Sequence, residues 1–488
     1  MKSIKVFLLA LITFSFAWLL PGFVLSDSEL PEIGDPSGRI LSPLKEQEIG
    51  ARLLRHLRSQ KLILDDPLVR HYIEDLGYKL VEHSDQADRR FEFFIVNDQS
   101  INAFAAPGGY IGIHTGLMDI AHNESELAAV LSHEIAHVTQ NHLARLFEAS
   151  QRQHWVTAVS LLAALLVGDK ELRNAALASS IAAGQQLQIN FTRGNEQEAD
   201  RVGIKILTDA GFDASSMPKF FQRLQSASSL HGTRMPDFLN THPVTSARIA
   251  ESMSYVPKNP PKKPIDNPNF YYMRARIKIL NQRQPERLVN YFRTQLNTGY
   301  SLNKKAVQYG LVLALTHARR YDEAHTYLDP LLKNDPTRLA LIVADAEIQL
   351  GKRNTQQVIE IYDTARVLFP NNEALVFYYS NALLELNQSK RAYKLLQEYL
   401  LQNKKRVNAH FHFNYAQAAA RTGSLAEAYQ HKAEHFYLNG HTKAAIEQLT
   451  QAAALKNLDY HLGSIIESRL QELKAEYLSA QGKKDHGG

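Results

Sequence analysis

Two histidines one helical turn apart, with a glutamate beside the first, are the residues of this sequence best suited to chemistry. Residues 133–137 read HEIAH, the pattern HExxH. On a helix, side chains four residues apart lie on one face, so His133 and His137 can bind one metal ion. Glu134 can take a proton from water that the metal makes acidic. The pattern predicts a metal-dependent hydrolase; an ordinary core helix with two incidental histidines is the alternative.

A catalytic zinc site needs a third protein ligand and an open fourth position. The chain has no cysteine, so every ligand must be a histidine or a carboxylate. The metzincin pattern requires a glycine and a third histidine where this chain has Gln140 and Leu143, so that class does not fit. His142 follows His137 by five residues, about 140° further round the helix, which predicts a position outside the ligand set.

The stretch NEQEADRVG, residues 195–203, supplies the carboxylates. Glu196 and Asp200 are four residues apart and share a helical face, whereas Glu198 points about 160° away from Glu196. We therefore predict that Glu196 is the third ligand and that Asp200 orients a ligating histidine. The alternative is a solvated acidic turn of helix.

Three motifs together resemble one family. HExxH, ExEAD at 196–200 and THPxxxxR at 241–248 are similar to the zinc metallopeptidase family that includes HtpX and the CAAX-prenyl endopeptidases. Residues 101–118, INAFAAPGGYIGIHTGLM, resemble the strand region that precedes the HExxH helix in that family.

The resemblance implies roles for these residues. One zinc ion per chain is expected on His133, His137 and Glu196, as in a gluzincin-like site. Glu134 is expected to act as general base and then to protonate the leaving amine.

Two further residues of the Thr-His-Pro motif region are site candidates by the same resemblance. His242 either stabilises the oxyanion or binds zinc as a fourth ligand and inhibits the resting enzyme, a role that needs a neutral imidazole. Arg248 is a candidate for oxyanion or substrate contacts, with a structural salt bridge as the alternative. Residues 102–105 are expected to form a sheet edge that binds substrate as an added strand, or simply an edge.

The elements that must position these residues are predicted to be mostly helical. Residues 44–60 and 67–83 have helical apolar spacing, and residues 91–96 and 110–114 are strand-like, with a turn at 105–109. A small sheet with a hairpin is therefore expected. Asn123 and Glu126 form a capping-box pattern that starts the HExxH helix.

Beyond a proline-rich segment the sequence becomes repetitive. Residues 256–268 hold five of the 18 prolines and predict a stiff linker. Ala324, Val358 and Ala392 then recur 34 residues apart at small positions of predicted second helices. This period resembles tetratricopeptide (TPR) repeats, which stack helix pairs into a solenoid with a concave binding groove. A non-repetitive helical bundle is the alternative.

The composition of the 488 residues is that of a folded protein of two or three domains. With 44% hydrophobic and 22% charged residues, it excludes a largely disordered chain. A net charge of +5 is too small to indicate nucleic-acid binding.

The first residues resemble a secretory signal, with Lys2 and Lys5 before an apolar run from Val6 to Leu20 and a cleavage site near Ser26/Asp27. An uncleaved anchor is the alternative. A cleaved signal implies work outside the cytoplasm, most simply in the periplasm of a Gram-negative bacterium.

The predicted fold class is mainly α: a helical zincin metalloprotease domain with a small β-sheet, followed by an α-solenoid of TPR repeats. The predicted division is a signal peptide at 1–26, an extended lead-in at 27–42, the protease domain at 43–255, the linker at 256–269, the repeats at 270–480 and a disordered tail at 481–488. Another apolar segment, 155–167, is too short to span a bilayer and is expected to be a buried helix or a peripheral membrane contact.

Within the family, the signal peptide, the lack of membrane spans and the repeats resemble the periplasmic members that serve outer-membrane assembly. The resemblance implies a zinc metalloendopeptidase with a chaperone-like role. It would degrade misfolded or stalled outer-membrane β-barrel proteins and aid their assembly, with the repeats binding these proteins and the β-barrel assembly machinery. Two alternatives stay open: a non-proteolytic TPR chaperone or scaffold with a structural zinc, and a metal-dependent amidase acting on cell-wall peptides.

Overall fold

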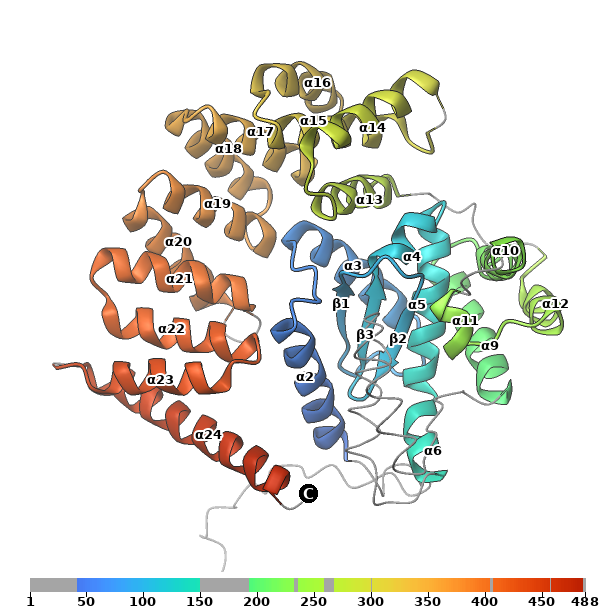
Figure 1. Ribbon diagram of the computed structural model, residues 1–488, viewed down its shortest axis with the longest axis horizontal. Helices are drawn as coiled ribbons and strands as arrows, with labels where there is room; N and C mark the ends of the chain where they lie inside the picture. Colours follow the sequence, from blue (N-terminus) through green and yellow to red (C-terminus); the bar gives the residue numbers. More distant parts are fainter. Residues whose placement is uncertain are drawn as a thin grey trace, which may run out of the picture.

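The computed structural model describes residues 42–149, 193–231, 236–258, 267–299, 301–403, 407–456 and 458–485. It confirms the predicted fold class: helices surround a three-stranded sheet in the first half, and helical hairpins stack into a solenoid in the second (Figure 1). The predicted signal segment and the apolar segment 155–167 lie outside the described residues. Among the described helices, none is both long and apolar enough to cross a membrane.

The sheet forms where the sequence predicts strands. After α2 (Pro43–Ser59) and α3 (Pro67–Val81) come β1 (Glu92–Val96), β2 (Ala103–Ala106) and β3 (Tyr110–His114). The strand order is β1-β3-β2, with β1 parallel and β2 antiparallel to β3. Gly108 and Gly109 both have φ near +78°, which suits them to the tight β2–β3 turn. The hairpin therefore leaves β2 at an edge of the sheet.

The helices that carry the predicted site pack beside this sheet. They are α4 (Thr115–Ile120), α5 (Glu124–Thr139), α6 (His142–Ala149), α9 (Arg193–Asp209), α10 (Ser216–His231), α11 (Asp237–Thr241) and α12 (Ser246–Tyr255). The Asn123 side chain caps α5 by accepting from the Glu126 N–H at 3.0 Å, as the sequence predicts. The Glu126 carboxylate accepts instead from His122 N–H, one residue earlier than in a standard capping box. All 16 residues of α5 are buried, so the HExxH motif lies in the core of this domain.

The second half is built from helix pairs. Its helices are α13 (Asn269–Leu280), α14 (Pro285–Thr298), α15 (Lys304–His317), α16 (Tyr321–Asn334), α17 (Leu339–Gly351), α18 (Thr355–Leu368), α19 (Glu373–Glu385), α20 (Ser389–Gln402), α21 (Ala409–Thr422), α22 (Leu425–Leu438), α23 (Thr442–Ala453) and α24 (Tyr460–Asp485). The first helices of four successive pairs, α15, α17, α19 and α21, begin 34 to 36 residues apart. The small residues predicted inside second helices, Ala324, Val358 and Ala392, are all fully buried. Helix α24 runs to Asp485, past the predicted start of the tail.

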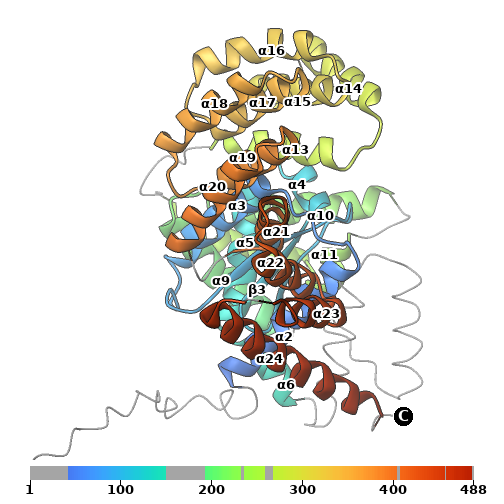
Figure 2. The same cartoon turned by 90° about the vertical axis from the view of Figure 1, so that its left-hand side faces the viewer.

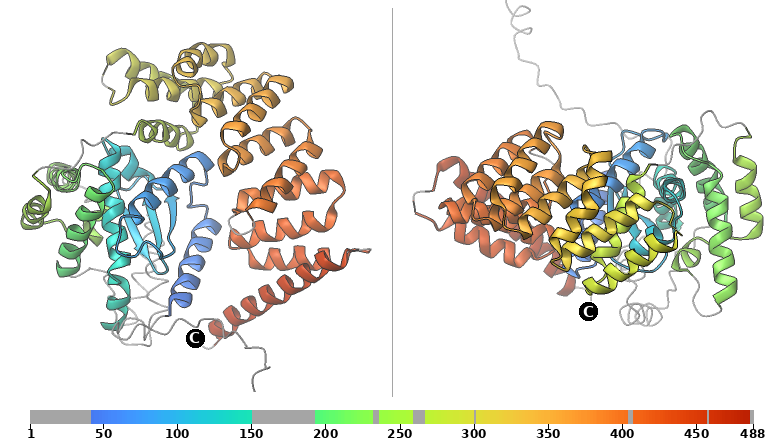
Figure 3. Two further views of the ribbon diagram at one scale, coloured as in Figure 1. Left: turned by 180° about the vertical axis from the view of Figure 1, so that it is seen from behind. Right: turned by 90° about the horizontal axis from the view of Figure 1, so that it is seen from above.

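The solenoid curves around one side of the protease domain. It runs from α13, above the sheet in Figure 1, to α24 below, and the view from the side in Figure 2 shows it in front of that domain. Helix α3 contacts α13 and α19, and α2 contacts α22. The view from behind in Figure 3 shows the same arc. One cluster of buried apolar side chains continues from Leu68 of α3 to Ala428 of α22. The two halves therefore share a core.

A set of buried polar side chains, here called the junction cluster, sits where the halves meet. It comprises Asp66, Arg276, Tyr309 and Tyr378. Arg276 Nε lies 2.9 and 3.0 Å from the two Asp66 oxygens, and Arg276 also donates to the hydroxyl oxygens of Tyr378 at 2.7 Å and Tyr309 at 3.3 Å. Tyr378 in turn donates to Asp66 at 2.9 Å. The cluster ties the start of α3 to three helices of the solenoid.

Candidate metal centre

Close packing of α5 against α9 assembles the centre. Glu196, Asp200 and Gly203 follow one another on one face of α9. A Cβ atom at Gly203 would lie 3.1 Å from the backbone nitrogen of His133, so glycine allows α9 to approach α5 closely there. This approach brings the acidic face of α9 to the two histidines of α5.

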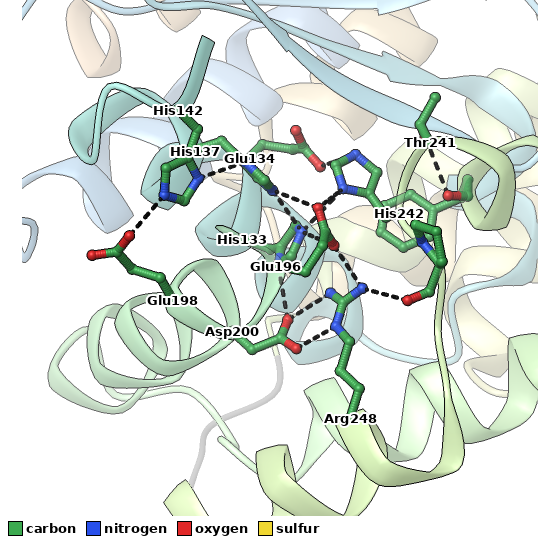
Figure 4. A network of polar contacts seen from close by, with 12 residues as sticks. His133, Glu134, His137, His142, Glu196, Glu198, Asp200, Thr241, His242 and Arg248 are labelled. Atoms are coloured by element: carbon green, nitrogen blue, oxygen red, sulfur yellow. Dashed lines mark hydrogen bonds and ion pairs between the residues drawn. The ribbon is translucent and has the colours of Figure 1, made fainter. Parts of the chain in front are cut away.

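Four side chains converge on one point between these helices (Figure 4). They are His133, His137, Glu196 and His242, all buried, and one donor atom from each lies within 4.8 Å of the others. The Nε2 atoms of His133 and His137 are 3.0 Å apart, and Glu196 oxygens lie 3.5 and 3.3 Å from them. Two imidazoles and a carboxylate are a donor set that suits zinc.

His242 enters the centre from a third helix. It caps the C-terminus of α11, where its backbone N–H donates to Phe238 at 2.8 Å and its ring stacks on the Phe238 ring. Its Nδ1 lies 2.9 Å from Glu196 and 3.3 Å from His133 Nε2, while its Nε2 lies 3.5 Å from Glu134. The ring therefore bridges the donor set and Glu134.

Asp200 and Arg248 lie behind the donor set. Asp200 Oδ1 is 2.9 Å from His133 Nδ1, the contact expected of a residue that orients a ligand. Arg248 pairs with both Asp200 oxygens at 2.5 and 2.8 Å and with Glu196 at 2.6 Å. It is 5% exposed. This is the arrangement of the structural salt bridge, the alternative to a direct substrate contact.

Glu134 differs from the other carboxylates of the site. It is fully buried, and neither of its oxygens has a hydrogen-bond partner among the described residues. Burial raises its pKa, although positive charge on His242 and His133 acts in the opposite direction. A buried carboxylate without a hydrogen-bond partner is costly unless something else satisfies it, such as a cation, a proton or a water molecule.

The charges of the other site residues depend on one another. Burial opposes protonation of His133, but its contacts with Asp200 and Glu196 outweigh burial and raise its pKa to about 9. Burial lowers the pKa of His137 well below its usual range. Burial alone would raise the pKa of Glu196, but His242, His133 and His137 hold it well below the usual value. A bound cation would take over the role of the proton on His133.

His142 contacts the centre, which the sequence did not indicate. The angle of about 140° assumes a continuous helix. However, α5 ends at Thr139, Asn141 adopts a left-handed φ of 53°, and α6 starts at His142. The break brings His142 Nδ1 to 2.9 Å from His137 Nδ1, and His142 Nε2 to 3.1 Å from Glu198. His142 remains outside the convergent donor set. The one sequence feature that could have predicted its contact with His137 is Asn141, because asparagine adopts the left-handed conformation that breaks the helix more readily than most residues.

Comparison with known proteins agrees with this chemistry. Residues 67–255 match the model of peptidase family M48. The chain is 33% identical over 456 residues to the beta-barrel assembly-enhancing protease of Escherichia coli, covering 93% of each chain. The protein of that name from Yersinia pestis is 32% identical, again over 93% of each chain.

More distant likenesses cover less of the molecule or are weaker. The mitochondrial metalloendopeptidase OMA1 of Schizosaccharomyces pombe is 27% identical over 38% of this chain and 53% of its own. The crystal structure of yeast Tom70 covers 77% of this chain and 87% of its own, at 13% identity and a TM-score of 0.30, which is too low to bear on the fold.

Proposed function

The chain belongs to the family of beta-barrel assembly-enhancing proteases and is a metallopeptidase with an M48 domain, and from this premise we propose that it is a periplasmic zinc endopeptidase that cleaves misfolded or stalled outer-membrane β-barrel proteins. The observation that carries the proposal is the buried carboxylate of Glu134, which lies beside a His-His-Glu donor set and has no hydrogen-bond partner among the described residues. A structural zinc site has no use for such a carboxylate, so this observation disfavours the non-proteolytic alternative.

The donor set fits zinc in number and type of ligand. His133, His137 and Glu196 would hold the ion, and Asp200 would fix the ring of His133 through its Nδ1. Zinc bound there would polarise the scissile carbonyl and make water more acidic.

Glu134 performs the proton transfers in this proposal. Its carboxylate accepts a proton from the attacking water and later donates it to the leaving amine. Burial, which raises its pKa, makes it a better base than an exposed glutamate.

The outer edge of β2 is proposed to bind the substrate backbone. Since β2 is the outer strand of the sheet and packs against α5, an extended peptide paired with it would run past Glu134. The backbone N–H of Ala105, in β2, is close enough to influence the pKa of Glu134. A strand-forming substrate, such as an unpaired segment of a β-barrel, suits this mode of binding.

His242 is proposed to keep the resting enzyme inactive. Its ring bridges Glu196 and Glu134, and it lies where the reacting groups must come together. Withdrawal of α11 would remove His242 from both carboxylates. The second hypothesis, in which His242 stabilises the oxyanion, predicts the opposite effect of its removal.

The solenoid is proposed to bind the unfolded outer-membrane protein and the β-barrel assembly machinery. Its curved stack of helix pairs is the kind of surface that binds extended partners. Its arc lies beside the protease domain, in contact with α2, α3 and α4.

The test is cleavage of an unfolded outer-membrane β-barrel protein by the purified chain, with zinc content measured in each variant. Glu134→Gln should lower kcat/KM by about 10²- to 10⁴-fold while zinc stays bound, because only the proton transfer is lost. His242→Ala should cleave faster than the wild type. A zinc-loaded wild type and His242→Ala that both fail to cleave would favour the chaperone or scaffold, and a slower His242→Ala would favour the oxyanion role.

A further inference from the structure

The two histidines of the predicted ligand set are supported from behind by different groups. His133 turns its Nδ1 to the carboxylate of Asp200 at 2.9 Å. His137 turns its Nδ1 to another histidine, His142, also at 2.9 Å (Figure 4). His142 is fully buried and its second nitrogen, Nε2, lies 3.1 Å from Glu198. His133 thus contacts a carboxylate directly, whereas His137 reaches one in two steps, through His142.

The two-step contact dictates where each proton sits. If His137 binds a metal through Nε2, its proton must be on Nδ1. That N–H donates to His142 Nδ1, which must then be the unprotonated acceptor. The proton of His142 is therefore on Nε2, where it donates to the carboxylate of Glu198. The proton on His137 Nδ1 therefore fixes the position of the proton on His142, and the last acceptor is the negatively charged carboxylate of Glu198.

The geometry of the chain supports a specific contact over chance packing. The helix breaks at Asn141 in a left-handed conformation that most residues avoid, and this break turns His142 back toward His137. The Glu198 oxygen that faces His142 also lies 3.2 Å from the guanidinium of Arg145. The contacts from His137 through His142 to Glu198 are here called the relay. The side chain of Glu198 is 30% exposed, so the relay joins the buried centre to the protein surface.

We propose that His142 and Glu198 are positioning residues that set the tautomer and orientation of His137 for zinc binding. The inference rests on the proposed function, because it requires that His137 bind a metal. It adds a second support to the centre, independent of Asp200 and Arg248. Neither His142 nor Glu198 belongs to the convergent donor set.

The experiment measures zinc affinity of the full chain by competition with a chelator, with no peptide present. His142→Phe, which keeps an aromatic ring but removes both nitrogens, should weaken zinc binding by about 10- to 100-fold, the range typical of lost ligand-orienting contacts. Glu198→Ala should weaken it less, because the His142–His137 contact survives without its anchor. His142→Asn, whose amide oxygen can accept from His137 Nδ1–H, should restore part of the loss.

Arg145→Ala is the matched control. It removes the other partner of Glu198 from the same helix as His142 but leaves the relay intact, so zinc affinity should not change. Thermal unfolding of each metal-free variant separates positioning from general damage to α6, since positioning changes affinity at an unchanged Tm.

Wild-type affinity in both His142→Phe and Glu198→Ala would overturn the relay and leave the proposed function standing. If His142→Phe does not fold, Glu198→Ala, altered at a partly exposed residue, decides alone. A wild type that binds no zinc would instead overturn the proposed function, and the relay with it.

Discussion

At the junction cluster, Arg276 donates to both oxygens of Asp66 and to two tyrosine hydroxyls, and Tyr378 donates to Asp66 as well. At the metal centre, three imidazoles crowd around Glu196, and Glu134 beside them has no hydrogen-bond partner among the described residues. Both regions bury charge in the core of the same molecule. The junction cluster satisfies its charges with its own hydrogen bonds, whereas the metal centre leaves donor atoms directed at a common point.

The pKa directions show the same contrast. Burial tends to raise the pKa of Asp66, but Arg276 more than compensates and lowers it. For Glu134, burial dominates and the pKa is raised. A closed network of this kind contributes stability, whereas an open one is retained at the expense of stability because it has chemistry to do. The difference identifies which of two buried ionic clusters is the functional one.

The largest effect on stability is expected from removing Arg276 from the junction cluster. Arg276→Met should lower the free energy of unfolding by about 3–5 kcal/mol, because it leaves Asp66 charged and buried without its partner. Urea unfolding of the full chain measures it. The double variant with Asp66→Asn should be more stable than Arg276→Met alone, since no charge remains unpaired. Equal stability of the two would show that the charge of Asp66 is not what makes the single change costly.

Low pH should weaken the junction cluster without a mutation. The pKa of Asp66 in the folded protein is below its ordinary value of 3.8, so the folded state binds this proton less readily than the unfolded chain. Its contribution to stability is therefore complete above the unfolded pKa and is lost as the pH falls through the lower, folded one. Unfolding curves across this acid range should show a steeper loss for the wild type than for Asp66→Asn. Parallel losses would contradict the assignment.

At the metal centre, a change to Asp200, which contacts His133, should affect zinc binding more than folding. Asp200→Asn should weaken zinc affinity by about 10- to 100-fold, because an amide holds His133 less firmly in the ligating tautomer. Chelator competition measures the affinity, and Arg276→Met serves as the control that should leave it unchanged. A loss of affinity in Arg276→Met as large as in Asp200→Asn would show that the two clusters are coupled through the shared core.

The smallest effect is expected where charges are exposed. Lys333 and Asp329 pair at 2.6 Å on α16, with side chains 74% and 47% exposed. Lys333→Ala should change the free energy of unfolding by only about 0.5 kcal/mol or less, since water already solvates both groups. A change comparable to that of Arg276→Met would mean that burial is not what separates these clusters.

Much of the architecture follows from local patterns in the sequence. The period of 34 residues predicts helix pairs, and the structure has them, because small residues must recur where paired helices touch. The hairpin was predictable from its glycine turn and the start of α5 from its asparagine cap. The resemblance to the metallopeptidase family is confirmed by the M48 match and by relatives aligned over nearly the whole chain.

The sequence by itself determined which side chains share a helical face: His133 with His137, and Glu196 with Asp200. Helix periodicity is a local property, so spacing alone is enough to predict it. Only the tertiary structure decided that these faces meet, through the close approach of the helices at Gly203.

Tertiary structure also decided the partners of three residues. It brought His242 in from α11, engaged Arg248 in a buried ion pair, and turned His142 back against His137. Each contact joins segments whose relative placement depends on packing or on a break in a helix. No spacing along the chain encodes such a placement.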